Sequence, residues 1–235
     1  MTALPATSAV PTPTADGAGA SRPSLVDRVR RAFTPFSLVA GPVVTAIGFT
    51  LHETEGKDHE EFLSNAGQHA LLWNLAHLLI PIGLVFFTAG FAGLLRLARG
   101  RGAGFLVPGV VLGMVGTIAT AIDGAAHGAV ESALMNRPDV SIEQSEQIQL
   151  DYMHSPFVFP LALLGMGMML GLLICGIGLF RSRRVPRWAA VLIMLSPVTL
   201  TFAGAGIVAP LGAAPLLAGA VVVARVLARS AERVA

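Results

Sequence analysis

The third long apolar stretch of the chain carries a regular series of small and ionisable residues. Its members are spaced three or four residues apart, so they fall in one stripe along a helix. Glycine occupies the first half of the stripe, and ionisable residues occupy the second half. Imidazole and carboxylate groups can bind zinc, copper or iron, and they can also carry protons. The stripe consists of Gly109, Gly113, Gly116, Thr120, Asp123, His127 and Glu131.

The second apolar stretch supplies a complementary helix face that carries His69 and His77. A short loop joins the second and third stretches, so the two helices must run antiparallel. We then expect His69 to lie level with Glu131 and His77 to lie level with Asp123. His127 is expected between these two levels. The spacing therefore predicts one polar pocket between two neighbouring helices.

Other titratable residues stand at the same end of the neighbouring apolar stretches. His52 ends the first stretch, and Asp151 and His154 come just before the fourth. Four helices are thus expected to converge on one pocket. Its predicted core is His77, Asp123 and His127, with His69 and Glu131 as neighbours and with His52, Asp151 and His154 as further candidate metal ligands.

Three functions compete for this pocket. It could bind a Zn, Cu or Fe ion, or one b-type haem held between His77 and His127. It could instead serve a small proton- or ion-coupled transporter, because the same groups titrate. Its polar contacts could also merely fix the helix packing of a non-catalytic membrane subunit. The usual hydrolase, zinc-protease and nucleotide-binding motifs do not occur, so no catalytic residue is assigned.

The composition identifies the elements that must position these residues. The chain is 54% hydrophobic and only 13% charged, whereas soluble domains carry about a quarter charged residues. Six apolar stretches approach the ~20 residues that cross a bilayer, and no period-two pattern favours a β-barrel. We expect an all-α integral membrane protein with a six-helix bundle and a tight turn marked by Pro210, Gly212 and Pro215. The predicted spans are about 33–51, 70–95, 105–130, 156–180, 188–208 and 211–227.

The arginines orient this bundle. They cluster before the first stretch, between residues 96 and 101, between 181 and 187, and after the sixth stretch. These are alternate connections, and basic residues favour the cytoplasmic side, so both termini are predicted to be cytoplasmic and the pocket to open outward. Residues 1–32 are expected to form a disordered tail with a basic juxtamembrane segment, 33–228 the membrane domain, and 229–235 a second tail. Arginine in place of lysine, with abundant alanine and glycine, is typical of a GC-rich bacterial genome, which suggests the cytoplasmic (inner) membrane.

The second outer connection should contain a short amphipathic helix over 141–153, because Ser141 is a good capping residue. The expected partner is membrane lipid, since the basic residues flank the spans and do not indicate nucleic acid. The glycine-rich helix faces could also bind a protein partner or a second copy of the chain.

Overall fold

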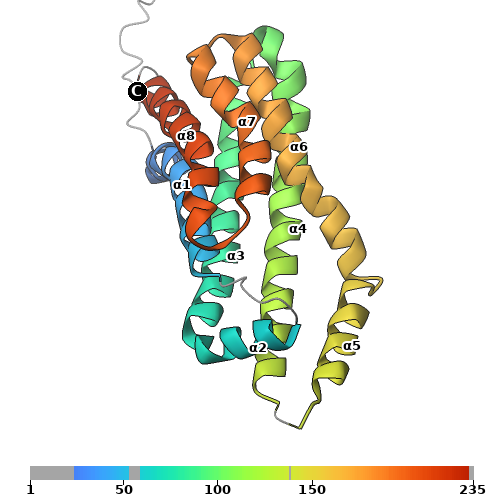
Figure 1. Cartoon of the computed structure of the whole chain (residues 1–235). Coiled ribbons are helices and arrows are strands. Elements are labelled where there is room, and N and C mark those ends of the chain that lie inside the picture. Colours follow the sequence, from blue (N-terminus) through green and yellow to red (C-terminus); the bar gives the residue numbers. More distant parts are fainter. Residues whose placement is uncertain (1–23, 53–58, 138, 233–235) are drawn as a thin grey trace, which may run out of the picture.

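The computed structural model describes residues 24–52, 59–137 and 139–232, and these residues form helices and no strand (Figure 1). The predicted all-α class is confirmed. Three short 3-10 turns accompany the α-helices: η1 (Leu95–Leu97), η2 (Gly100–Gly102) and η3 (Gly206–Val208). The α-helices are α1 (Leu25–Leu51), α2 (His59–Gln68), α3 (Ala70–Leu94), α4 (Ala103–Met135), α5 (Ile142–Met153), α6 (Val158–Ser182), α7 (Arg187–Ala203) and α8 (Ala209–Glu232).

Five of the described helices, α1, α3, α4, α6 and α8, are long and apolar enough to cross a membrane. The chain is therefore an integral multi-pass membrane protein. The sixth apolar helix, α7, has 17 residues and is shorter than the other five. Many large apolar side chains point outward from the bundle, as lipid-facing residues do; Leu71, Val85, Phe159 and Phe202 are all exposed.

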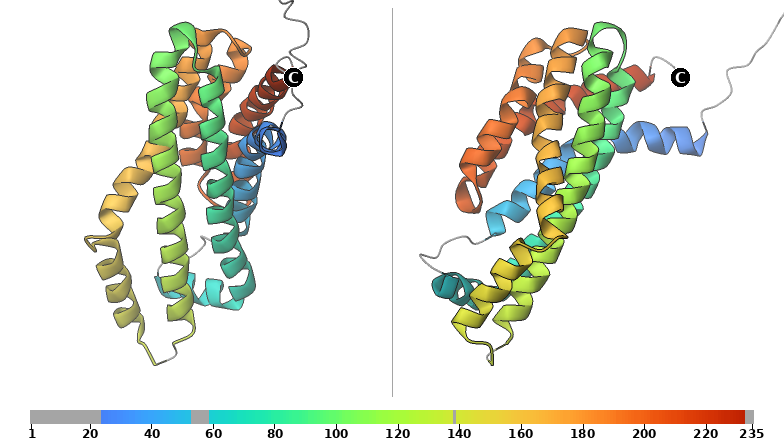
Figure 2. Two further views of the ribbon diagram at one scale, coloured as in Figure 1. Left: turned by 180° about the vertical axis from the view of Figure 1, so that it is seen from behind. Right: turned by 90° about the vertical axis from the view of Figure 1, so that its right-hand side faces the viewer.

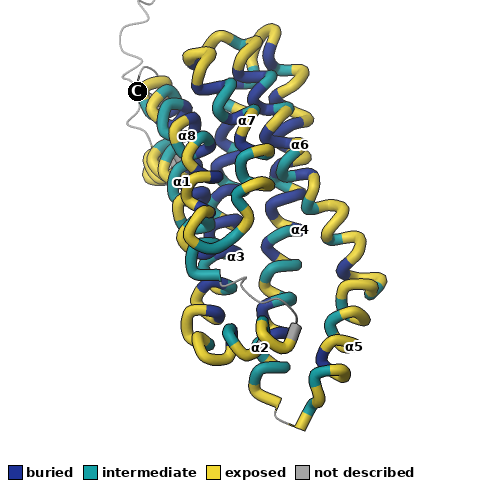
Figure 3. The backbone as a smooth tube through the Cα atoms, viewed as in Figure 1, coloured by how far each residue is buried: buried dark blue, intermediate teal, exposed yellow. Residues whose placement is uncertain are grey.

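The six apolar helices form a closed ring in the order α1, α3, α4, α6, α7, α8 (Figures 1 and 2). Each helix packs against the next one in this order, and α8 packs back against α1. Figure 3 shows the buried residues along the inward faces of this ring. The ring encloses a common interior, in which residues from helices far apart in the sequence meet.

The glycine half of the α4 stripe lies at the closest helix contacts. A Cβ atom at Gly113 would overlap the Phe91 ring of α3, and one at Gly116 would overlap the backbone at Met168 of α6. Glycine permits this approach because it has no side chain. The stripe thus packs against helices of the same chain, and a partner at this face stays a prediction.

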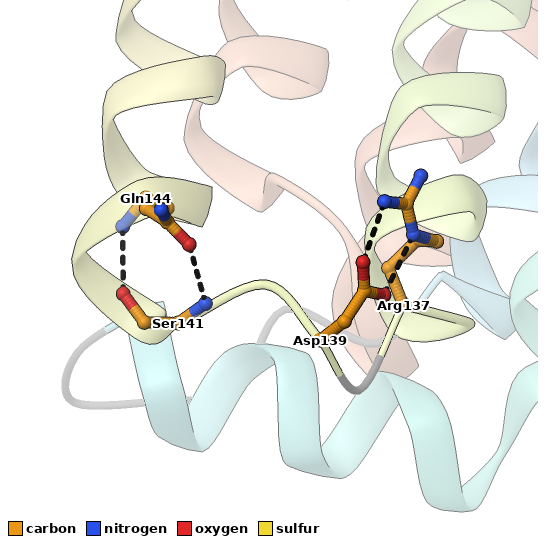
Figure 4. Close-up of polar contacts among 4 residues, drawn as sticks. All are labelled: Arg137, Asp139, Ser141 and Gln144. Carbon is orange, nitrogen blue, oxygen red and sulfur yellow. Dashed lines mark hydrogen bonds and ion pairs between the residues drawn. The ribbon is translucent and has the colours of Figure 1, made fainter.

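Two short helices, α2 and α5, lie at one end of the bundle, where Figure 1 shows them beside the lower part of α4. The predicted helix α5 is present, and its capping box joins Ser141 and Gln144 (Figure 4). Helix α2 was not predicted, and it is held by burial of Ala66 and by the Phe62 ring, whose centroid lies 5.2 Å from that of Trp73.

The predicted turn between the last two apolar helices was wrong in position. Pro210 lies in the first turn of α8, where proline is tolerated, and Pro215 lies further inside the same helix. The chain turns earlier, at Gly204 and Gly206, whose φ angles of 61° and 75° favour glycine. Helix α1 also begins at Leu25, within the segment expected to be a disordered tail. Residues 1–23 and 233–235 lie outside the described residues.

Candidate functional site

Three histidines from different parts of the bundle form a row of rings. His52 directly follows α1, His77 lies in α3, and His127 lies in α4. The ring centroids of His52 and His77 are 4.8 Å apart, and those of His77 and His127 are 5.9 Å apart. We call His52, His77 and His127 the histidine row. His77 and His127 were predicted as core residues, and His52 only as a further candidate.

Two aromatic residues flank the histidine row. Trp73 is almost fully buried, and its ring centroid lies 4.3 Å from that of His77 and 4.8 Å from that of His52. Tyr152 of α5 flanks the other end, with its ring centroid 6.1 Å from that of His127. The Tyr152 hydroxyl donates a hydrogen bond of 3.4 Å to the backbone carbonyl of Asp123. Burial and the adjacent Asp123 raise the pKa of Tyr152 to about 12.

His77 is held in one orientation by its own helix and by α4. Its Nδ1 atom donates to the Trp73 carbonyl one turn earlier, at 3.0 Å. The carbonyl can only accept, so Nδ1 carries the hydrogen of the neutral ring, and Nε2 remains for proton exchange or ligation. The ring rests on Gly128, where a Cβ atom would overlap the imidazole.

The predicted level of His77 was wrong. His77 lies level with Gly128 of α4 rather than with Asp123. The same register places the hydroxyls of Thr88 and Thr117 within hydrogen-bond distance, at 2.8 Å. In this register α4 extends past the last turn of α3, and the connecting segment with η1 and η2 bridges the difference.

Two carboxylates accompany the histidine row on α4. Glu131 follows His127 by one turn, and its side chain is fully buried. Neither of its carboxylate oxygens has a hydrogen-bond partner within the described part of the chain, and the same is true of one Asp123 oxygen. An unpaired buried carboxylate is costly, and such residues in membrane helices favour a functional role.

The remaining candidates lie at the surface. The exposed rings of His69 and His154 each approach a backbone carbonyl one turn earlier in the chain, of Asn65 and Leu150 respectively. Asp151 is exposed and accepts a hydrogen bond from Gln147. The structure brings these three residues into solvent-facing positions rather than into the histidine row.

Two hollows adjoin the histidine row. A central cavity of about 580 Å³ lies inside the ring, and all six apolar helices line it; its polar lining side chains are Thr45, His52 and Thr120. A groove of about 520 Å³ lies between α3 and α4, and His77 is on its wall together with Asn74 and Ser132. His52 therefore belongs to the cavity wall, and His77 belongs to the groove wall.

No three His, Cys, Asp or Glu residues in segments 24–52, 59–137 and 139–232 are arranged to hold a metal ion. The metal site remains a prediction on the residues named above. Comparison with protein-family models, with curated proteins and with solved structures finds no match for the chain.

Three features of the site were missed in the sequence. The sequence analysis assigns neither Trp73 nor Tyr152 to the pocket. Gly128 lies outside the stripe, although a glycine directly after His127 could have indicated a close approach to that face of α4. Tyr152 offered the clearer signal, because it is the only tyrosine of the chain.

Proposed function

We propose that the chain is a small proton-coupled membrane carrier. The central cavity would bind the solute, and the histidine row would move the proton. One observation carries this proposal: the His52 ring on the cavity wall packs against the His77 ring on the groove wall, with ring centroids 4.8 Å apart and the ring planes tilted by 49°. The two imidazoles thus bridge the interior of the bundle and a groove on its surface.

The cavity lining indicates the kind of solute. The cavity volume of about 580 Å³ falls in the range of small-molecule sites, which are mostly apolar with a few polar groups. No carboxylate, lysine or arginine lines it, so the solute should be neutral. The Thr45 hydroxyl is buried without a hydrogen-bond partner in the described chain. It would pair with a hydroxyl or carbonyl group of an otherwise apolar molecule.

Histidine suits the proton step because it gains and loses a proton near neutral pH. In the row, the Nε2 atom of His77 would exchange protons with the groove. His52 would then carry the positive charge at the cavity wall, where that charge would alter the affinity for the solute. The buried carboxylate of Glu131 gives the row a nearby group that can hold or release a further proton.

The same proposal includes a membrane topology. We infer six spans, with α7 as the shortest, and both termini in the cytoplasm. The arginine-rich connections lie at the end of the bundle opposite to α2 and α5 (Figure 1). Basic residues favour the cytoplasm, so the groove and the histidine row would face outward from a bacterial inner membrane.

The test uses the purified full chain in liposomes with a trapped pH dye and an imposed pH gradient. Neutral apolar alcohols and esters are then added, since such solutes carry no protons through lipid by themselves. The carrier should dissipate the gradient in a solute-dependent manner. Ala46→Phe, which fills the cavity wall, should abolish the effect, while Val43→Phe on the exposed face of α1 should keep it. No solute-dependent proton movement across a broad panel would contradict the proposal.

A single bound metal ion or haem is the second candidate. The observation that favours it is the approach of three imidazoles, from α3, from α4 and from the residue that follows α1. A Zn, Cu or Fe ion would take nitrogen ligands from the histidine row, with Asp123 or Glu131 as an oxygen ligand. Elemental analysis and a visible spectrum of the purified protein decide this case. Stoichiometric metal supports a bound ion, and a Soret band supports haem. If neither is found, the carrier function is the one that remains.

A further inference from the structure

Six arginines line one hollow at the opposite end of the bundle from the histidine row. The hollow has a volume of about 450 Å³ and lies between the α3–α4 connection and the α6–α7 turn. We call it the arginine pocket. No carboxylate belongs to its lining, which consists of Arg99, Gly100, Arg101, Phe180, Arg181, Ser182, Arg183, Arg184 and Arg187.

The arginine pocket is built by a close contact between its two walls. A Cβ atom at Gly102 would overlap the carbonyl oxygen of Gly178 in α6, so the α3–α4 connection sits directly on the end of that helix. Arg183 turns the other wall in the left-handed conformation, with φ of 54°, and the Arg184 backbone N–H donates to the Ser182 hydroxyl at 3.3 Å. Two arginine-bearing segments are thus held face to face.

Aromatic rings hold two of the guanidinium groups. The Arg181 guanidinium lies 5.2 Å from the Phe105 ring centroid, and that of Arg187 lies 5.3 Å from the Phe180 ring centroid. A guanidinium stacked on a ring still presents its N–H edge to an anion. Arginine also matches phosphate oxygens with paired hydrogen bonds, which lysine cannot reproduce.

The position of the pocket points to lipid as the source of the phosphate. It lies where the candidate spans Ala70–Leu97, Gly100–Met135 and Val158–Ser182 begin or end, which is the depth of phospholipid headgroups. Exposed apolar side chains lie on it or next to it, since Phe180 belongs to its lining and Trp188 directly follows Arg187. These side chains can contact acyl chains while the arginines contact the headgroup.

We propose that the arginine pocket binds the phosphate groups of an anionic phospholipid, with a two-phosphate headgroup such as that of cardiolipin fitting its six charges best. Basic residues at this end of the bundle are enough to orient the chain in the membrane. Their convergence on one hollow is not needed for that role and indicates a ligand. Basic pockets between membrane helices are suited to such headgroups. This inference does not rest on the proposed carrier function.

The test uses Trp188, which neighbours the pocket, as the reporter. The purified full chain in detergent is titrated with brominated cardiolipin, brominated phosphatidylglycerol or brominated phosphatidylcholine, and quenching of tryptophan emission is measured. Cardiolipin should quench at the lowest concentration and phosphatidylcholine only weakly. Trp188→Phe should remove the quenching, because Trp73 is buried at the other end of the bundle.

Charge variants separate a specific pocket from general attraction. The double variant Arg101→Gln with Arg184→Gln should weaken cardiolipin binding about tenfold, as loss of charge-assisted hydrogen bonds predicts. The matched control, Arg225→Gln with Arg229→Gln on α8, should leave it unchanged. The corresponding double lysine variant keeps the charge and the orientation, and it should bind with intermediate affinity.

Two results would overturn the proposal. Equal cardiolipin binding by wild type and by the Arg101→Gln, Arg184→Gln double variant would show that general surface charge attracts the lipid and that the pocket does not bind it specifically. Displacement of cardiolipin from the wild type by millimolar inorganic phosphate would identify a site for free anions instead of lipid.

Discussion

The rings of His52 and His77 are in contact, with centroids 4.8 Å apart and planes tilted by 49°, yet they line two different hollows. His52 is reached from the central cavity, and His77 is reached from the groove between α3 and α4. Two titratable rings in contact thus link the lining of one space to the lining of the other.

Tyr152 should titrate far above an ordinary tyrosine. Its pKa is raised to about 12 by burial and by the adjacent Asp123. Because the chain has one tyrosine, tyrosinate absorbance against pH reports this residue alone. Asp123→Asn should lower the pKa toward its usual value of about 10. A wild-type midpoint near 10 would show that α5 does not pack against α4 as described.

The same shift has a consequence for stability. Between pH 10 and 12 the unfolded chain ionises Tyr152, whereas the folded chain keeps it neutral. The unfolded state then binds fewer protons, so the free energy of unfolding should fall as the pH rises through this window. Below pH 10 this contribution is fully present. Tyr152→Phe should remove this part of the alkaline loss of stability, measured by denaturant unfolding in detergent.

Gly128→Ala should disturb the histidine row more than any other glycine substitution on the same part of α4. The new Cβ atom would overlap the Cβ and Cγ atoms of His77, which are tied to the α3 backbone, so helix α3 must shift. Overpacking costs about 1–3 kcal/mol, only partly offset by the ~0.5–1 kcal/mol helix gain of alanine over glycine.

Gly124→Ala is the matched control for this substitution. Its Cβ atom would meet only Ile80 at 4.0 Å, an ordinary contact. Thermal unfolding should show a lower midpoint for Gly128→Ala and an unchanged or higher midpoint for Gly124→Ala. Equal midpoints for the two variants would mean that His77 does not rest on Gly128.

Gly113→Leu should disrupt the bundle, because the leucine would occupy the space of the Phe91 ring between α3 and α4. We expect loss of monodisperse protein in detergent or a large fall in the unfolding midpoint. Val111→Leu, two positions earlier on an exposed face, should be tolerated. Similar behaviour of the two variants would place the glycine stripe against lipid.

Cysteine labelling tests the proposed topology. Asp139→Cys and Arg99→Cys are both at exposed positions, and the native Cys175 is fully buried, so background labelling should be low. A membrane-impermeant thiol reagent added to intact cells should label residue 139 and not residue 99. Labelling of both positions from the same side would contradict the six-span, N-in and C-in arrangement.

The helical architecture could be predicted because each long apolar stretch has few ways to satisfy its backbone in lipid. The α5 helix was likewise predictable, since Ser141 and Gln144 form a local capping box. Helix α2 was not predictable, because it is stabilised by contacts with other helices, such as that of Phe62 with Trp73. Its own sequence does not reveal these contacts.

The sequence allowed the residues of the site to be predicted better than their arrangement in space. His77 and His127 were identified because ionisable residues are rare in apolar helices. Their register was not, because it depends on how the α3–α4 connection folds into two 3-10 turns. His52 was expected near the pocket because it ends the first apolar stretch, but its ring contact with His77 depends on the α1–α3 packing, which no local spacing reveals.

The most direct test of the carrier proposal compares the His77→Gln variant with wild type. Each protein is placed in liposomes with an imposed pH gradient, and a neutral solute that binds the protein is added. His77→Gln should still bind the solute, because His77 does not line the cavity, but solute-dependent proton movement should fall at least tenfold. His154→Gln, an exposed control, should behave like wild type. Undiminished proton movement in a correctly folded His77→Gln protein would contradict the account.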